Sequence, residues 1–237
     1  MRIQYFCTAI LLVTTYCGGA ELTREQELIV ACHRLDVDTV VGALRNGADA
    51  NGRFGDGDAK LFQDPWTLGW PGAAAKWTPL IAVASASDYP PPPNVKNAPG
   101  EVNTPPEDRK KIPLEKIEQR KRDALTIARI LLSSRADIDA DDGYGATALY
   151  KAVYLKKPEV AKLLVQFNAK VNTKTGIYID GDGDITPLHR AYWSAELTKL
   201  LLEKGADPKA KDTSGRTPRD WSIHSDDPAV AKLYQLP

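Results

Sequence analysis

Imperfect copies of one short pattern recur along this chain, and they constrain its fold more than any other feature. The fullest copy is Thr186-Pro187-Leu188-His189, which is followed by Ala191 and by a leucine-rich stretch that ends at Gly205-Ala206-Asp207. Other copies keep only the start or the end of the pattern: Gly47-Ala48-Asp49, Thr78-Pro79-Leu80, Arg135-Ala136-Asp137 and Thr217-Pro218. Such a chain is expected to stack one structural unit several times.

Each recurring residue has a structural reason. A threonine hydroxyl can cap the free amides at a helix start, and proline fits the first helical position, so helices are predicted to begin at Thr78, Thr186 and Thr217. Glycine suits the left-handed residue that ends a helix, as at Gly205, and Asn168 takes that place in another copy. The apolar residues between these signals have helical spacing, so the pattern predicts pairs of packed helices.

The pattern resembles the ankyrin family, whose signature is Thr-Pro-Leu-His-x-Ala with a period of about 33 residues. The resemblance implies an all-α solenoid of stacked helix pairs with β-hairpin-like finger loops. We expect a single domain over 21–237 after a signal peptide over 1–20. Its units are expected at about 22–51, 77–139 with an insertion at 89–122, 142–172, 184–210 and 213–237.

Composition fits a globular chain with an ordinary core, with 43% hydrophobic and 26% charged residues. Lysine plus arginine number 31, as do aspartate plus glutamate, and no basic patch is interleaved with aromatic residues. This balance argues against nucleic acid as a partner. No glycine-rich phosphate loop is visible, so no cofactor is predicted, and a monomer is expected.

The N-terminus has the form of a secretory signal. Arg2 gives a positive start, 10–13 are apolar, and the small residues at 18–20 mark a cleavage site. The apolar stretch is too short to cross a bilayer, so an exported protein, periplasmic or secreted and without stable membrane insertion, is predicted. Cys17 leaves open an alternative, anchoring as a lipoprotein.

Cys32 is the one cysteine that such cleavage leaves in the chain, so no intramolecular disulfide is expected. It stands where ankyrin repeats usually carry a small buried alanine, which favours a packing role. The alternative is a nucleophile paired with His33. Neighbouring helical residues point about 100° apart, which makes that pair awkward.

A first insertion, 52–76, contains Trp66 and Trp70 and is followed by Trp77. Tryptophans in a loop rich in glycine and proline are typical of a contact surface, because rigid rings bury much area at low entropic cost. The alternative is that they cover the exposed end of the stack. Trp77 adjoins the helix start at Thr78 and is predicted to lie in the core.

The second insertion, 89–122, is rich in proline in its first part, which forbids a regular helix there and favours an extended conformation. A docking site for a proline-reading module is an alternative that the export signal disfavours. Charged residues alternate with isoleucine and leucine over 110–122, which indicates a short helix leading into the next one.

The third insertion, 173–185, holds Tyr178, Asp180 and Asp182. Alternating aspartates imitate the start of a calcium loop, but Ile185 and Ala191 stand where glycine and glutamate are needed. A β-hairpin with Asp-Gly turns explains the same residues.

The first and third insertions extend turns that form fingers along one edge of ankyrin proteins, and insertions on one face of a solenoid often mark its binding face. The predicted function is therefore a non-enzymatic scaffold that binds another protein through its finger loops and concave face. The candidate contact residues are Trp66, Trp70, Tyr178, Asp180 and Asp182. The alternative is an enzyme or calcium-binding protein with a site on the inserted loops. The resemblance implies a structural role for His189.

Overall fold

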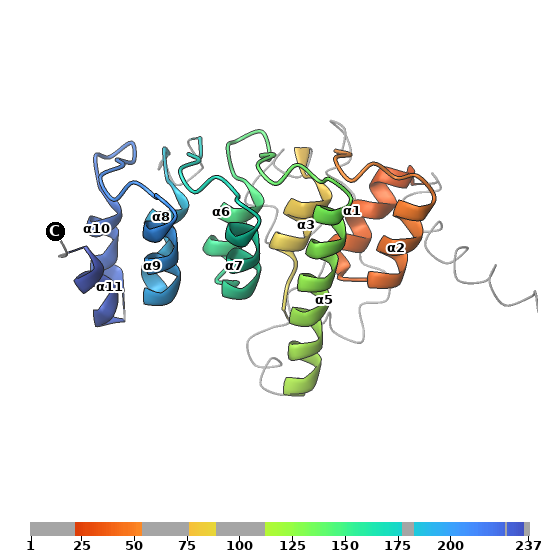
Figure 1. The fold of residues 1–237 in the computed structure, drawn as a ribbon, viewed down its shortest axis with the longest axis horizontal. Helices are drawn as coiled ribbons and strands as arrows, with labels where there is room; N and C mark the ends of the chain where they lie inside the picture. The colour runs from red at the N-terminus through yellow and green to blue at the C-terminus, as the bar shows by residue number, and fades with distance from the viewer. Residues whose placement is uncertain (1–21, 54–75, 89–111, 177–182, 226, 235–237) are drawn as a thin grey trace, which may run out of the picture.

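The computed structural model describes residues 22–53, 76–88, 112–176, 183–225 and 227–234. These residues form a row of helix pairs that follow one another in chain order (Figure 1). The pairs are α1 (Arg24–Arg34) with α2 (Val37–Arg45), α3 (Pro79–Ser85) with α5 (Leu114–Ser133), α6 (Ala148–Tyr154) with α7 (Pro158–Gln166), α8 (Pro187–Arg190) and η4 (Ala191–Trp193) with α9 (Ala195–Glu203), and α10 (Pro218–Trp221) and η5 (Ser222–His224) with α11 (Pro228–Leu233). The described residues hold no strand beyond an isolated bridge, so the prediction of an all-α solenoid is confirmed.

Threonine begins the first helix of every pair. The hydroxyl of the capping threonine accepts the amide hydrogen three residues on at Thr23, Thr78, Thr147 and Thr217. The predicted starts at Thr78, Thr186 and Thr217 are confirmed. At Thr23 the side chain of Gln26 also accepts the threonine amide at 2.8 Å, which completes a capping box where the Thr-Pro signal is missing.

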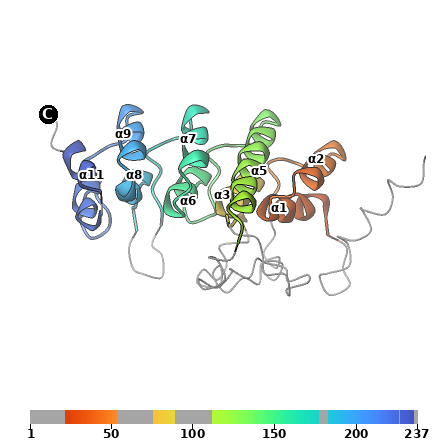
Figure 2. The same ribbon diagram turned by 90° about the horizontal axis from the view of Figure 1, so that it is seen from below.

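The helices form two rows with the core between them. First helices α1, α3, α6, α8 and α10 touch in sequence, as do second helices α2, α5, α7, α9 and α11 (Figure 2). Leucines at the same position of successive first helices are fully buried, namely Leu28, Leu80, Leu149 and Leu188. Trp77 is also buried, which confirms its predicted place in the core. Because each pair covers its neighbour's apolar side, the main core runs from α1 to α9, and Ala146, Tyr150, Ile185 and Trp221 form a second, smaller cluster.

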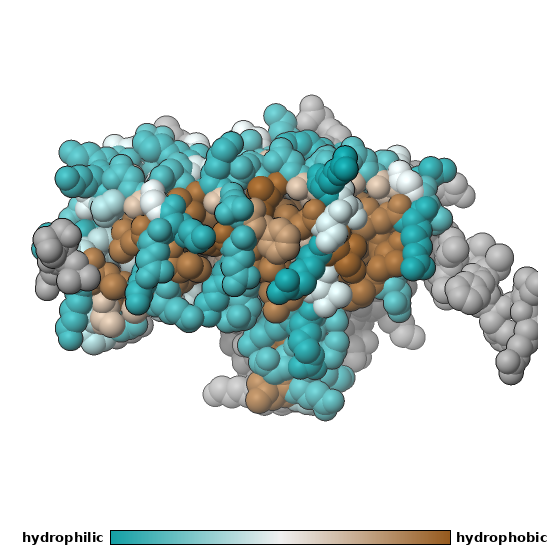
Figure 3. All heavy atoms as spheres, viewed as in Figure 1, coloured by the Kyte–Doolittle hydropathy of each residue, from teal (hydrophilic) through white to brown (hydrophobic). Residues whose placement is uncertain are grey.

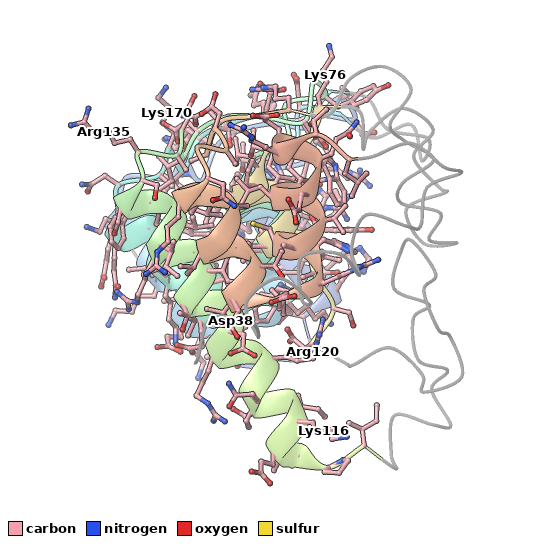
Figure 4. All side chains as sticks on the ribbon, turned by 90° about the vertical axis from the view of Figure 1, so that its right-hand side faces the viewer. Asp38, Lys76, Lys116, Arg120, Arg135 and Lys170 are labelled. Carbon is pink, nitrogen blue, oxygen red and sulfur yellow. The ribbon has the colours of Figure 1, made fainter. Side chains whose placement is uncertain are left out.

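Helix α5 is longer than the other second helices, with 20 residues. The sequence predicted a short helix over 110–122 leading into another, and the structure has one continuous helix instead. Arg120 secures it, because its Nε donates to the Ser87 carbonyl at 3.0 Å and its Nη1 to the Arg34 carbonyl at 3.2 Å. The first turns of α5, which carry Lys116, project beyond the stack (Figures 1 and 4).

The second helices α2, α5, α7 and α9 are each followed by a left-handed residue. Gly205 has a φ of 84° and Asn168 of 63°, as the sequence predicted for both, and Arg135 takes the same conformation after α5 with a φ of 62°. The next amide then reaches back to a helix carbonyl, for example from Ala206 to Leu201 at 2.9 Å. This turn sends the chain toward the next pair.

Asparagine and aspartate side chains join successive turns along one edge of the row, which we call the turn edge. The Asn172 side chain donates to the Gly205 carbonyl at 2.9 Å and accepts the Asp207 amide at 2.8 Å. Asn51 makes the same two bonds to the turn after α5. Asp139 accepts the Lys170 amide at 2.8 Å, but a carboxylate cannot donate to a carbonyl. Figure 4 shows Arg135 and Lys170 together at this edge.

Replacing Asn172 by aspartate is therefore expected to lower the free energy of unfolding by about 1–2 kcal/mol, because one bond is lost and the charge faces a carbonyl. Asp139→Asn is the reverse change. It keeps the acceptor and gains a donor toward the Asn168 carbonyl, while losing only an exposed 3.5 Å pair with Lys170, so it is expected to be neutral or stabilising. Urea unfolding of both variants measures the difference, and equal losses would contradict it.

The face formed by the second helices is polar with an apolar band between the helices (Figure 3). The partly buried leucines packed against the core include Leu44, Leu125, Leu132 and Leu202. Among the described residues, no helix has the length and apolar character that crossing a membrane requires.

Candidate functional site

The contact residues predicted from the sequence lie outside the described residues. They are Trp66, Trp70, Tyr178, Asp180 and Asp182, and each stays a prediction. The structure does describe the residues at which both insertions leave and rejoin the stack, as well as the exposed part of the first-helix face.

The two ends of the first insertion are held together at the turn edge. Arg53 donates through Nη1 to the Lys76 carbonyl at 3.3 Å and to the Asp141 carbonyl at 2.8 Å. The Lys76 side chain covers Gly143 of the neighbouring turn. One guanidinium therefore fixes the base of this insertion to the third helix pair.

The base of the third insertion is a short antiparallel pairing. The Thr175 amide donates to the Ile185 carbonyl at 3.1 Å, and the Asp184 amide donates to the Thr175 carbonyl at 2.7 Å. The Gly183 amide donates to the hydroxyl of Thr213 in the turn before α10 at 3.0 Å, and the Thr213 amide donates to the Gly183 carbonyl at 3.1 Å. Both insertions thus start from fixed points on the same edge of the stack.

Aromatic and arginine side chains gather on the first-helix face of the last three pairs. We call this group, which consists of Tyr154, Arg190, Tyr192, Arg216 and Trp221, the aromatic–arginine patch. The Arg190 guanidinium carbon lies 5.0 Å from the Tyr154 ring centroid and 4.6 Å from that of Trp221. The Arg216 carbon lies 4.9 Å from the Trp221 centroid, and the Tyr192 ring lies 6.4 Å from it. Because α6, α8 and α10 each contribute, the patch depends on the stacking of three pairs.

Hydrogen bonds to Tyr150 and Asp212 hold the side chains of the patch in place. The Arg190 Nε donates to the Tyr150 hydroxyl at 3.2 Å, and the Tyr150 ring is stacked with that of Tyr154. The buried Asp212 carboxylate accepts from the Trp221 indole at 3.0 Å and from Arg216 Nε at 2.8 Å. Burial acts to raise the pKa of Asp212, but these bonds outweigh it and lower the pKa, so the carboxylate stays charged.

Exposure places the patch where another molecule can reach it. Tyr154 is 42% exposed, Arg190, Tyr192 and Arg216 are half-buried, and Trp221 is buried. The first two pairs carry the buried residues Val30 and Ala82 at the position of Arg190. Among the described residues, the accessible aromatic and arginine side chains of this face therefore lie in the C-terminal half. Ring faces and guanidinium groups suit recognition of a surface.

Residues 118–212 match the family model for ankyrin repeats, in three copies. The chain thus contains ankyrin repeats. It is 33% identical over 120 residues to ankyrin repeat and SOCS box protein 11 of Danio rerio, a match that covers 50% of this chain and 38% of that protein. It is 32% identical over 111 residues to Rabankyrin-5 of Mus musculus, which covers 41% of this chain and 9% of that protein.

The chain thus spans well under half the length of these relatives. Ankyrin repeats generally mediate protein–protein interaction, and the family is typically non-enzymatic. The sequence did not single out the patch. The sequence feature that could have revealed it is the position directly after the histidine of the ankyrin signature. This position is Arg190 in the fourth pair and Trp221 in the fifth.

His189 has the structural role that the ankyrin resemblance implied. Its Nδ1 lies 3.1 Å from the Thr186 amide nitrogen, and its Nε2 lies 3.2 Å from the Arg216 carbonyl oxygen. The ring therefore links the start of α8 to the turn before the next pair. Both ring nitrogens are engaged by backbone, and Nδ1 also lies 2.9 Å from the Thr186 hydroxyl oxygen.

Cys32 is fully buried in α1, and burial raises the pKa of its thiol. Burial, together with the nearby charges of Lys157, Arg120 and Arg34, lowers the pKa of His33 to about 3. A nucleophilic pair needs a lowered thiol pKa and access to substrate. These properties favour the packing interpretation over the nucleophile.

Acid is expected to destabilise the protein partly through His33. Its folded pKa lies below its unfolded value of 6.5, so the folded state binds fewer protons and stability falls as pH falls from about 6.5 toward 3. One such group contributes a slope of up to about 1.4 kcal/mol per pH unit. Denaturant unfolding at pH 7, 6 and 5 should show a smaller loss for His33→Phe than for the native chain. An unchanged slope in the variant would contradict this assignment.

The calcium alternative depends on Asp180 and Asp182, which lie outside the described residues. Asp184 is described, and its carboxylate lies 3.4 Å from Lys174 Nζ. Among the described residues, no group of three or more histidine, cysteine, aspartate or glutamate side chains is placed to hold a metal ion.

Proposed function

We propose that this protein is a binding scaffold that holds a partner protein against the first-helix face of its C-terminal half. The observation that carries the proposal is the aromatic–arginine patch. Tyrosine, tryptophan and arginine dominate the binding energy of protein interfaces, since they bury large areas and lose little conformational entropy. Arg190 and Arg216 are already stacked on rings, which reduces the entropy that they would lose on binding.

Two side chains of the patch are suited to a test. Tyr154 is 42% exposed at the end of α6, so its removal leaves the core intact. Arg190 crosses from the Tyr154 ring to the Trp221 ring and so lies at the centre of the patch. We expect Tyr154→Ala and Arg190→Ala each to weaken partner binding about tenfold or more, as for central interface residues.

The chain offers a matched control. Phe167, just after α7, is 44% exposed, and loss of its ring removes a similar apolar area outside the patch. The tagged protein would be crosslinked in its native compartment and its partners quantified by mass spectrometry. A partner whose recovery drops for Tyr154→Ala and Arg190→Ala but not for Phe167→Ala supports the proposal. If all three variants recover the same partners equally, the patch is not the contact surface.

The finger loops are proposed as a second contact region, formed by Trp66, Trp70, Tyr178, Asp180 and Asp182. The fixed bases of both insertions support this proposal, since both lie on the turn edge of the stack. Combined Trp66→Ala and Trp70→Ala should lose the partner that the patch variants lose. Unchanged binding would remove these rings from the site.

Export is proposed from the N-terminal pattern alone. Expression of the full chain with a C-terminal tag should give a protein that begins at Glu21, as determined by N-terminal sequencing. A product that retains Met1 would argue against export. A product that begins at a lipid-modified Cys17 would show anchoring as a lipoprotein.

A further inference from the structure

We propose that His189 is a proton-operated latch, which in its neutral form holds the C-terminal helix pair (α10, η5 and α11) on the preceding pair and releases it when protonated. Trp221 of the aromatic–arginine patch lies in this helix pair, and Arg216 lies in the turn before it. Release of the pair would therefore also separate these two residues from Tyr154 and Arg190. The latch acts within the chain and does not depend on which partner binds.

The hydrogen bonds of the ring require the neutral form. A backbone amide only donates and a carbonyl only accepts, so Nδ1 must accept from the Thr186 amide at 3.1 Å while Nε2–H donates to the Arg216 carbonyl at 3.2 Å. A protonated imidazole carries hydrogen on both nitrogens and cannot accept. Its Nδ1–H could donate to the Thr186 hydroxyl oxygen, which lies 2.9 Å away, but the Thr186 amide would lose its acceptor and face a second donor inside a fully buried site.

The charges around His189 do not compensate a buried imidazolium. Arg190 follows it in α8, Lys174 lies in the turn before α8, and Arg216 lies in the turn before α10. Asp212 is the acidic group near the ring, and its carboxylate already pairs with Arg216 Nε at 2.8 Å. On α6, Lys151 pairs with Asp142 at 3.0 Å.

Burial is the largest influence and lowers the pKa of His189, and Arg190 and Lys174 act in the same direction. The Arg216 carbonyl and Asp212 oppose this shift without reversing it.

The last pair is the element that this change would release first. Among the described residues, this pair packs on one neighbour only, the pair of α8 and α9, whereas an internal pair packs on two. Its helices are short, with 4 residues in α10 and 6 in α11. The Trp221 ring packs edge-on against His189, with centroids 6.0 Å apart, so the histidine supports both the backbone and the main apolar side chain of this pair.

The direction of the pH effect follows from the lowered pKa. The docked form binds fewer protons than the released form, whose histidine titrates near 6.5. Docking is therefore fully stable above about pH 6.5 and weakens as pH falls below that value. One proton coupled to release raises the opening equilibrium constant by up to tenfold for each pH unit.

Hydrogen exchange followed by mass spectrometry on the full chain tests the latch. Peptides within 213–234 report the last pair, and peptides within 148–166 report an internal pair as reference. After correction for intrinsic exchange rates, protection over 213–234 is expected to fall by up to about tenfold between pH 7.5 and 5.5, while the reference changes less. His189→Gln lacks a titrating ring, so its protection over 213–234 should be lower at pH 7.5 and independent of pH. His33→Phe, far from this junction, should behave as the native chain.

A second measurement covers the case in which His189→Gln does not fold. Nitrogen-15 chemical shifts of the His189 ring in the native chain show directly when the ring takes up a proton. The latch requires that this protonation coincide with loss of protection over 213–234. If the ring is protonated while 213–234 stays protected, or if both pairs lose protection together at every pH, the latch is refuted.

Discussion

Replacing Gly145 by alanine is expected to lower the free energy of unfolding by about 3 kcal/mol or more, the largest effect expected of a glycine-to-alanine change among the described residues. Gly145 has a φ of +78°, where an alanine is strained by roughly 1 kcal/mol. A Cβ at this position would also lie 2.2 Å from the Lys174 carbonyl oxygen and 3.2 Å from Thr175 Cα. Both atoms belong to backbone, so the clash moves the turn at 173–176 as a whole.

Gly205→Ala is the matched control, because it separates the strain from the clash. Gly205 has a φ of +84° and nothing within 4 Å of a Cβ, so only the backbone strain of about 1 kcal/mol is expected. Urea unfolding of both variants measures the contrast. Equal losses would show that the turn at 173–176 yields to the clash at no cost.

The close approach at Gly145 also shows how the finger bases depend on neighbouring pairs. The Gly176 amide donates to the Tyr144 carbonyl at 2.6 Å, so the turn before α6 supports the base of the third insertion. Gly145→Ala would therefore disturb this base as well as stability. Contacts between helix pairs are hard to predict from the sequence, because each repeated pattern describes only one unit.

Much of the fold could be predicted because its signals are local. Thr-Pro at Thr78 and Thr217 places caps and rigid first turns within a few residues, and Gly205 or Asn168 marks a left-handed helix end. Prediction from local sequence was weaker where tertiary contacts override a residue's intrinsic conformational preference. Arg135 adopts a positive φ that arginine rarely takes, because the turn after α5 must match its neighbours. Helix α5 extends through Arg120, which donates to one carbonyl just after α3 in its own pair and to one in α1 of the first pair.

The candidate site was harder to predict than the fold. Loop tryptophans stood out in the sequence because composition reveals them, whereas the patch exists only when Tyr154, Arg190 and Trp221 are brought together from three pairs. Asp212, which fixes Trp221, reads in sequence as an ordinary turn residue. Aligning the units by their threonine caps would have placed Arg190 and Trp221 at equivalent positions on one face.

Breaking the buried ion pair between Asp142 and Lys151 is the other change with a large expected effect. The Asp142 side chain is fully buried, accepts the Tyr144 and Ala146 amides at 3.0 and 3.2 Å, and lies 3.0 Å from Lys151 Nζ. Asp142→Asn keeps the amide bonds but removes the charge opposite a buried ammonium group. We expect a loss of about 3 kcal/mol at pH 7, since a buried charge that loses its partner is costly.

Lys151→Met and the double variant complete a thermodynamic cycle. Methionine fills the space of the lysine stem, and the asparagine retains its two amide bonds, so the double variant should lose less than the sum of the single changes. Additive losses would mean that the two groups do not interact.

The pH dependence gives an independent test of the same pair. Burial lowers the pKa of Lys151, while Asp142 opposes that shift. Removing Asp142 should lower the folded pKa further, so the folded variant sheds its proton more readily than the unfolded chain does. The cost of Asp142→Asn should therefore shrink as pH rises from 7 toward 10, by up to about 1.4 kcal/mol per unit. A cost that is independent of pH would place the charge of Lys151 in contact with water rather than inside the stack.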